Sequence, residues 1–258
     1  MNQPAFDPRC FQSALTTATV GRFLIYRERT ETTMELARRE AHEGAPHGTL
    51  VLTEEQTAGR GRKGRSFHSP PGENLYFTLV LRLPLDQHRR LPVIAPVAVC
   101  AAVAAEGVQA RIKWPNDIWA GERKLCGMLI DAELTADGAL AMPGIGINVN
   151  GDPTRNPELA AIATSVAREL GHPVAREELL AHVCNELEAA IDSPPGELML
   201  RYRVMSMILG RRVTVLPAVG EPFEANASEV AGDGSLVVVR DNGLSEQLNA
   251  AEVSLRPV

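Results

Sequence analysis

A stretch rich in glycine and arginine, residues 56–67 (QTAGRGRKGRSF), holds the side chains best suited to binding an anion. It carries four cations and no acid: Arg60, Arg62, Lys63 and Arg65. Its glycines let the backbone approach a ligand closely, and the segment forms no stable helix or strand by itself. We expect a loop that orders around a phosphate-bearing ligand, with arginine forks and backbone N–H groups as donors. A solvated basic loop or a nonspecific nucleic-acid patch is the alternative, and the P-loop spacing is absent.

Three further stretches hold groups that could act with this loop. In 113–117 (KWPND), Lys113 stands at the end of an expected strand beside a rigid turn, where a cation is well fixed. In 123–127 (RKLCG), Lys124 precedes an apolar strand that contains a glycine. In 144–148 (GIGIN), two glycines lack the third glycine and the following helix of a dinucleotide site, which excludes a Rossmann loop. Taken singly, each stretch is also compatible with a purely structural role.

Composition limits the classes of protein. With 258 residues, 45% of them hydrophobic, the chain can build one large domain and a small one. The net charge of −6 makes the basic loop a local feature, which argues against general nucleic-acid binding. The four cysteines form no C-x-x-C pair, so zinc and a disulfide framework are not expected.

No targeting or membrane segment is expected. The N-terminus lacks a basic region followed by an apolar run, so no signal peptide is expected. The apolar stretch 91–105 contains Pro92 and Pro96 and is too short to span a bilayer. We therefore expect a cytoplasmic protein without a membrane partner.

The elements that must position these groups follow from periodicity. Residues 1–22 are weakly patterned and predict a loose lead-in. Thr32 and Glu35 fit a capping box at the start of a helix ending near His42. Alternation predicts a strand with one buried face over 74–83. Other strands are expected at 23–27, 49–53, 111–114, 118–120, 124–133 and 140–149, and helices at 91–106, 157–170, 176–191 and 196–209. Beyond Arg211, short strands at 213–216, 223–230, 236–240 and 246–249 predict a small β-barrel.

Together, in this order and spacing, the four stretches resemble those of biotin protein ligases. Residues 56–70 are similar to the biotinyl-adenylate loop of that family, and 113–117, 123–127 and 144–148 are similar to its next three motifs. Residues 163–165 (ATS) and 252–256 (EVSLR) resemble further recurring pieces. The resemblance covers about residue 23 to the end of the chain.

The resemblance implies an ATP-dependent biotin–[acetyl-CoA-carboxylase] ligase. Biotin carboxylate attacks the α-phosphate of Mg-ATP to give biotinyl-5′-AMP and pyrophosphate, and a lysine of a biotin carboxyl carrier protein then displaces AMP. Such steps depend on cations aimed at developing negative charge, and the acyl-adenylate must be shielded from water by a closing loop. The implied catalytic cations are Arg60, Arg62, Lys113 and Lys124.

The implied binding residues carry over position by position. The positions that match biotin contacts are Thr32, Thr33, Met34, Gln56, Gly59, Arg60, Gly61, Arg62, Lys124, Gly127, Leu129, Gly144 and Gly146. The positions that match nucleotide contacts are Arg62, Phe67, Lys113, Asn116, Asp117, Asn148 and Arg256. Asp117 orients Lys113 or helps to hold Mg²⁺, and the metal ligands stay open. Phe67 stands where the family often has Trp, and Met34 where it has Asn, from which we expect a modest loss of affinity.

The implied fold is α+β: a mixed, mainly antiparallel sheet flanked by helices, as in class II aminoacyl-tRNA synthetases, followed by a small SH3-like barrel. We expect the catalytic domain over 1–209 and the barrel over 210–258. About 22 residues precede the first expected strand, too few for the helix-turn-helix domain of gene-regulating members. We therefore expect the monofunctional type, a monomer or homodimer with no nucleic-acid partner.

Two other functions remain as alternatives. A lipoate–protein ligase shares the fold, and the arginine loop together with the C-terminal barrel favours biotin over lipoate. A nucleic-acid-binding regulator would use Arg60 to Arg65 as a basic patch, which the acidity of the whole chain argues against.

Overall fold

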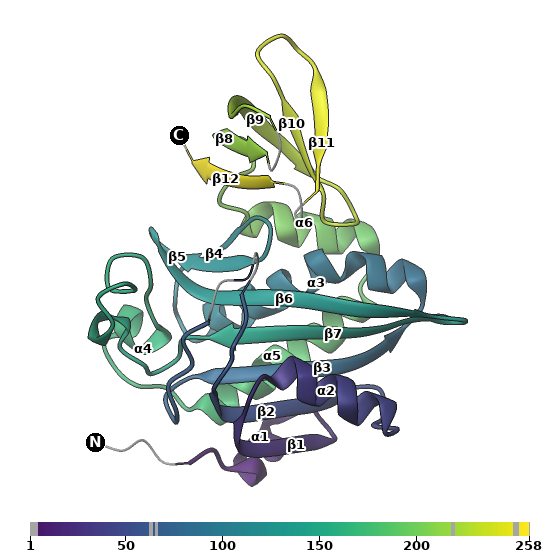
Figure 1. Ribbon diagram of the computed structural model, residues 1–258, viewed down its shortest axis with the longest axis vertical. Coiled ribbons are helices and arrows are strands. Elements are labelled where there is room, and N and C mark those ends of the chain that lie inside the picture. The colour runs from purple at the N-terminus through teal and green to yellow at the C-terminus, as the bar shows by residue number, and fades with distance from the viewer. Residues whose placement is uncertain (1–4, 62–63, 65–66, 218–219, 250–252, 258) are drawn as a thin grey trace.

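The computed structural model describes residues 5–61, 64, 67–217, 220–249 and 253–257, and it contains two sheets (Figure 1). In the seven-stranded sheet only the first pair is parallel and the other pairs are antiparallel, which confirms the expected mixed, mainly antiparallel sheet. Its strand order is β1 (Leu24–Thr30), β2 (Thr49–Gln56), β3 (Leu75–Leu83), β7 (Gly138–Ile147), β6 (Arg123–Thr135), β5 (Asp117–Ala120) and β4 (Ala110–Lys113).

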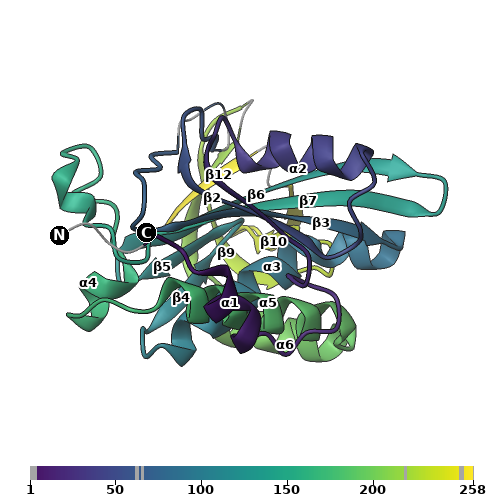
Figure 2. The same cartoon turned by 90° about the horizontal axis from the view of Figure 1, so that it is seen from below.

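Helices cover the two faces of this sheet unequally. Helix α2 (Thr33–His42) lies on one face, and α3 (Leu85–Ala105) with α5 (Arg176–Asp192) lies on the other (Figure 2). Helix α6 (Pro195–Met205) packs against α3. Because α2 contacts β2, β3 and β7, the same face of the strands beyond them carries no helix among the described residues. That uncovered face is where a ligand can reach the sheet.

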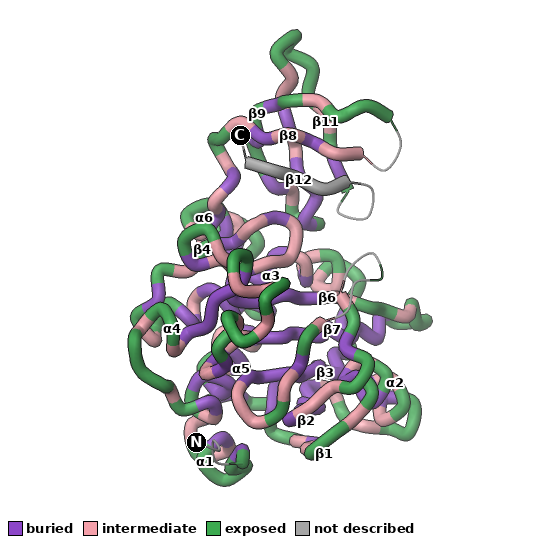
Figure 3. The backbone as a smooth tube through the Cα atoms, turned by 60° about the vertical axis from the view of Figure 1, so that its left-hand side comes forward, coloured by how far each residue is buried: buried purple, intermediate pink, exposed green. Residues whose placement is uncertain are grey.

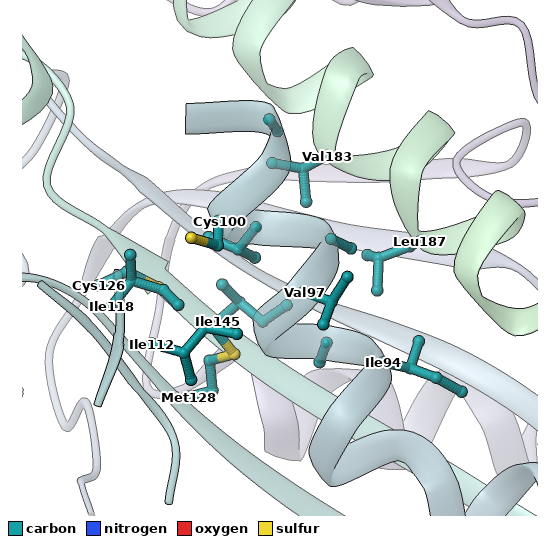
Figure 4. Close-up of a cluster of buried hydrophobic side chains, with 14 of the residues drawn as sticks. Ile94, Val97, Cys100, Ile112, Ile118, Cys126, Met128, Ile145, Val183 and Leu187 are labelled. Atoms are coloured by element: carbon teal, nitrogen blue, oxygen red, sulfur yellow. The ribbon is translucent and has the colours of Figure 1, made fainter. Parts of the chain in front are cut away.

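The main core lies between the sheet and α3. Ile94, Val97 and Cys100 of α3 face the strands on one side and α5 on the other (Figure 4). Among the described residues, α3 is the one helix long and apolar enough to cross a membrane, but 61% of its apolar window is buried inside the protein. We therefore interpret α3 as a core helix. It begins earlier than the predicted helix over 91–106, and it accommodates both Pro92 and Pro96.

Burial of β3 differs from the prediction. Its residues from Leu75 to Leu81 are all buried, on both faces (Figure 3). The reason is that β3 lies in the middle of the sheet, with α2 packed on one face and the main core on the other. The alternating hydrophobic pattern identified the strand, but it did not show that both faces of the strand are buried.

The N-terminal segment also differs from the prediction of a loose lead-in. Residues 8–14 form helix α1 (Pro8–Ala14), which Asp7 caps by accepting from the Arg9 N–H. Phe6, Phe11 and Val20 are buried in the main core. The weak pattern of this segment reflects short turns around a few aromatic anchors, which periodicity does not detect.

The helix predicted over 157–170 is mostly absent. The 3-10 turn η2 (Pro153–Arg155) precedes the segment, which contains irregular turns and a short helix, α4 (Val166–Leu170). Beyond its own local turns, its backbone pairs with β6: Lys124 N–H donates to the Ile162 carbonyl at 2.9 Å, and Thr164 N–H donates to the Lys124 carbonyl at 2.9 Å. Tertiary pairing has overridden helix propensity here.

The C-terminal residues form a five-stranded sheet. All its neighbouring pairs are antiparallel. Among the described residues the first and last strands of this sheet do not pair with each other. The structure therefore shows an open sheet where a closed barrel was predicted. The strands, in order, are β11 (Ser245–Leu248), β10 (Leu236–Val239), β9 (Phe223–Val230), β8 (Arg212–Pro217) and β12 (Val253–Pro257).

The two sheets are joined by direct contacts. Trp114 is buried and donates from Nε1 to the Gly234 carbonyl at 2.8 Å. Ile112 also forms a bridge with Ser206, in the segment that leads from α6 to the small sheet. The small sheet therefore rests on the end of β4 and the turn that follows it. The division at 209/210 stays a prediction.

Candidate active site

The site lies over four paired residues on the uncovered sheet face. Gly127 of β6 is opposite Gly146 of β7, and Leu129 is opposite Gly144. Three of the four lack a side chain, which leaves room above the sheet backbone for a cavity of about 370 Å³. This volume falls within the range of small-molecule sites, roughly 300–1,000 Å³.

Two side chains lie directly on these glycines, which explains why no larger residue fits. A Cβ on Gly146 would stand 2.5 Å from the ring of Phe67, and a Cβ on Gly144 would stand 2.7 Å from Met34 Cγ. The Phe67 ring also meets Tyr76 edge-on, with ring centroids 6.2 Å apart. Phe67 and Met34 thus form the walls that face the glycine floor.

One end of the cavity is polar because helix α2 begins there. Thr32 caps the helix by accepting from the Glu35 N–H at 3.0 Å, which confirms the predicted cap. Gln56 Oε1 accepts from the Thr33 N–H at 2.9 Å, and Thr78 donates to the Thr33 hydroxyl at 2.9 Å. This network fixes hydroxyl and amide groups that suit a polar, uncharged ligand group.

Lys124 and Asp117 mark the cationic part of the cavity. Lys124 Nζ lies 2.7 Å from Asp117 Oδ1, with both side chains partly exposed. The lysine side chain lies across Gly127, where an added Cβ would stand 2.8 Å from Nζ. The pairing of its backbone with residues 162–164 fixes where this amine lies.

Lys113 lies beside this pair but not in the cavity wall. Its Nζ lies 3.5 Å from the ring centroid of Trp119, a cation–π contact. Burial and then the Lys124 charge lower the pKa of the Lys113 amine, while Asp117 acts to raise it, and the net result lies below the ordinary value. Asp117 contacts Lys124 directly, so its carboxylate does not serve Lys113 alone.

Two asparagines hold the walls in place. Asn116 donates from Nδ2 to the Met128 carbonyl, and the Met128 N–H donates back to the Asn116 carbonyl at 3.1 Å. Asn148 donates to the Thr164 carbonyl at 3.0 Å. Both side chains line the cavity while tying the turns around it to β6 and β7.

Most residues expected from the sequence come together here. Those that line the cavity are Thr32, Thr33, Met34, Gln56, Arg60, Gly61, Phe67, Asn116, Asp117, Lys124, Gly127, Leu129, Gly144, Gly146 and Asn148.

Two of the expected residues, Gly59 and Lys113, do not line it. Gly59 closes the base of the loop, where its carbonyl accepts from the Phe67 N–H at 2.9 Å. Lys113 lies beside the cavity, on Trp119. Arg62 lies outside the described residues. Arg256 lies on β12, paired in register with Thr214.

The sequence did not indicate a charged cluster at the α2 end. Arg38 bonds Asp131 at 2.7 Å, Glu35 at 3.0 Å and Glu133 at 3.1 Å, and it lines the cavity with the first two of these acids. The available signal was the position of Arg38 one helical turn after Glu35. The acids of β6 are far from Arg38 in the sequence, so only the fold shows that they bond to it.

Comparison with known proteins gives a consistent family. The model of the biotin/lipoate A/B protein ligase family matches residues 26–150. The chain is 39% identical over 174 residues to the bifunctional ligase/repressor BirA of Bacillus subtilis, covering 66% of this chain and 54% of that protein. It is 34% identical over 221 residues to the biotin–[acetyl-CoA-carboxylase] ligase of Paracoccus denitrificans, covering 81% of this chain and 91% of that one.

A solved structure extends the likeness to the fold. The biotin protein ligase of Aquifex aeolicus, in complex with biotin and ATP, superposes with a TM-score of 0.75 and 27% identity. The match covers 92% of this chain and all of that one. The present chain therefore shares its fold with that protein over most of its length, although it spans only about half the length of the Bacillus relative.

Proposed function

Because the chain belongs to the biotin protein ligases of the biotin/lipoate A/B protein ligase family, we propose that it activates biotin with ATP and transfers it to a carrier protein. The observation that carries this proposal is the glycine-floored cavity with Lys124 lying across its floor. An apolar floor suits a fused bicyclic ring system, and the polar groups around Thr33 suit a ureido group.

The first step forms the mixed anhydride. A biotin carboxylate oxygen attacks the α-phosphorus of ATP, the bond to the β-phosphate oxygen breaks, and pyrophosphate leaves. Negative charge gathers on the α-phosphate oxygens, where a fixed ammonium stabilises it most. The position of Lys124 between the glycine floor and Asp117 supports this role. Arg60, which also lines the cavity, would supply a second cation.

The second step transfers the acyl group. The amine of a carrier lysine attacks the acyl carbon, the bond from that carbon to the AMP oxygen breaks, and AMP leaves as the amine loses its proton. Relatives carry the name biotin–[acetyl-CoA-carboxylase] ligase. We propose a biotin carboxyl carrier protein as the partner here, with no part for nucleic acid or membrane.

The assignment of the two ends follows from their chemistry. The end at α2, with Thr32, Thr33 and Gln56, would hold biotin, and the end near Asn148 would hold the nucleotide. The basic loop would close over the adenylate, because water must be excluded from it. In this proposal Arg62 and Arg256 contact phosphate, and the Phe67 ring stacks on the adenine.

Mg²⁺ would arrive with the ATP phosphates, since this ion is commonly held by one or two carboxylates together with substrate phosphates. Asp117 is the carboxylate that lines the cavity beside Lys124. Among the described residues no group of three or more His, Cys, Asp or Glu side chains could hold a metal by itself. That donor set fits an ion shared with the nucleotide better than one caged by protein. We propose a cytoplasmic setting, a domain division at 209/210 and a monomer or homodimer.

The direct test is incorporation of radiolabelled biotin into a purified carrier domain with ATP and Mg²⁺. We expect labelling that needs all four components, and pyrophosphate exchange into ATP that responds to biotin. A protein that exchanges pyrophosphate with lipoate and not with biotin would be a lipoate ligase, and the proposal would then be wrong.

A further inference from the structure

Four side chains at the β4 edge of the sheet share one face. Asp117 pairs in register with Lys113, and Trp119 pairs with Lys124. Ile112 and Ile118, the intervening residues, are buried in the core under the opposite face. The two lysines, the aspartate and the indole therefore lie together on the side of the sheet that carries the cavity.

This group has one more positive charge than negative. Two lysine amines stand near one carboxylate, and that carboxylate bonds Lys124. The second amine, on Lys113, is held by the Trp119 ring at 3.5 Å. An aromatic ring attracts a cation without cancelling its charge, whereas a second carboxylate would have cancelled it. The surplus charge suits an anion.

The location of the surplus charge suggests which anion. Lys124 and Asp117 line the cavity, and Lys113 is the next amine outward, across β5 on the edge strand. In the proposed reaction the α-phosphate lies at Lys124, so the β- and γ-phosphates extend beyond the cavity. Resting on the proposed function, we infer that Trp119 is a positioning residue whose ring holds the Lys113 ammonium where it binds the departing pyrophosphate.

The indole N–H takes no part in this role. Trp119 Nε1 is buried and has no hydrogen-bond partner among the described residues. Replacing Trp119 by Phe therefore keeps a ring under Lys113 and breaks no hydrogen bond, while Trp119→Leu removes the ring. Comparing the two variants separates the effect of the aromatic ring from the effect of side-chain volume.

The experiment compares the two half-reactions in these variants. We expect Trp119→Leu to raise the KM for ATP and for pyrophosphate in the exchange reaction by about tenfold, within the range of a partly desolvated cation–π contact. Trp119→Phe should restore most of the loss. Transfer from supplied biotinyl-5′-AMP to the carrier should stay within about twofold of wild type, because no pyrophosphate is involved.

A double-mutant cycle with Lys113→Met tests whether Trp119 acts through Lys113. In that background Trp119→Leu should have no further effect on the KM for ATP. Tyr202→Phe serves as a control, since its buried hydroxyl also lacks a partner among the described residues but lies between α6 and β9. Tyr202→Phe should leave both half-reactions unchanged.

Three outcomes would overturn the inference: an unchanged KM for ATP in Trp119→Leu, equal slowing of both half-reactions, or a Phe variant as impaired as the Leu variant. Failure of the proposed function is distinguishable, because wild-type protein would then show no biotin-dependent exchange at all.

Discussion

Glycine residues create much of the cavity because they have no side chain to fill it. Gly144 and Gly146 face the walls made by Met34 and Phe67, and any Cβ there would collide with them. These positions could be found from the sequence because glycine inside a strand marks a close approach. The sequence could not say which side chains approach, since Met34 and Phe67 come from a helix start and a loop far away along the chain.

Gly146→Ala should impair binding more than folding. The added methyl group would meet the far end of the Phe67 side chain at 2.5 Å, and a ring in a loop can move aside. We expect a loss of stability below about 1 kcal/mol and a rise of about tenfold in the biotin KM, equivalent to about 1.4 kcal/mol. Thermal unfolding and steady-state kinetics measure the two effects.

Gly196→Ala is the matched control for this change. Gly196 lies in α6 with nothing within 4 Å of the added Cβ, so neither stability nor the biotin KM should worsen. If Gly146→Ala bound biotin normally, the floor of the cavity would not be the biotin site.

Lys124→Ala should abolish adenylate formation while the protein stays folded. The substitution removes the amine that bonds Asp117 and lies across the floor of the cavity. Loss of one preorganised donor to developing charge typically slows a reaction by about 10²–10³-fold. Biotin-dependent pyrophosphate exchange gives the rate, and circular dichroism verifies the fold.

The neighbouring Arg123→Ala is the control. Arg123 pairs with Glu169 outside the cavity wall, so its loss should change the rate by no more than about twofold, as expected for a surface ion pair. Near-normal exchange by Lys124→Ala would contradict the catalytic role of this lysine.

At the scale of elements, the sequence predicted long periodic segments better than irregular ones. Helix α2 and strand β9 appear as expected, because a cap and an alternating pattern are local signals. The N-terminal segment and residues 157–165 were predicted wrongly. Their structure depends on partners elsewhere: Phe11 packs in the main core, and the second segment pairs with β6.

A buried ion pair fastens the N-terminal segment to the sheet. Arg176 of α5 bonds Glu54 of β2 at 2.6 and 3.1 Å. Glu54 also accepts from the Phe6 N–H and the Tyr26 hydroxyl, each at 2.9 Å. Glu54 lies two residues before Gln56 on the same strand, so this network supports the strand that leads into the cavity.

Glu54→Gln should destabilise the protein at neutral pH. Burial acts to raise the pKa of Glu54, but the bonds from Arg176, Phe6 and Tyr26 outweigh it and hold the pKa below the ordinary 4.5. The variant leaves a buried arginine without its carboxylate, which costs about 3–5 kcal/mol. Denaturant unfolding at several pH values measures the loss.

The pH dependence of this stability loss tests whether the charge of Glu54 is responsible. A carboxyl with a lowered pKa in the folded state stabilises the protein above its unfolded value, and that contribution disappears as the pH falls through the folded value. The gap between wild type and Glu54→Gln should therefore be full above pH 4.5 and narrow below it. Glu28→Gln, at an exposed position of β1, should show no such gap. A gap independent of pH would mean that the carboxylate charge is not responsible.

For the whole molecule, the relation between the two sheets is the feature that the sequence revealed least. Glycine turns predicted a small β unit after residue 210, yet not how it packs. The contact is made by Trp114, inside the KWPND motif, and by Gly234 in the turn between β9 and β10. A contact across 120 residues leaves no local pattern.

This contact links the small sheet to the site, because Trp114 adjoins Lys113 and the turn that carries Asn116 and Asp117. Gly234 has φ +83°, and a Cβ there would stand 2.5 Å from Pro92 Cβ of α3. Gly243 has φ +82° with nothing within 4 Å. The pair Gly234→Ala and Gly243→Ala therefore shares the same backbone strain, and only the first adds a collision, which is between the small sheet and helix α3.

We expect both variants to lose about 1–2 kcal/mol from the left-handed backbone, and Gly234→Ala to lose a further 1–3 kcal/mol, roughly, from overpacking. If Arg256 of the small sheet reaches the nucleotide as proposed, Gly234→Ala should also raise the KM for ATP several-fold, while the KM for biotin stays near wild type because the α2 end lies on the large sheet. Gly243→Ala should leave both KM values unchanged. Equal stability of the two variants, or a rise in the biotin KM alone, would show that the packing of the small sheet does not support the nucleotide end of the site.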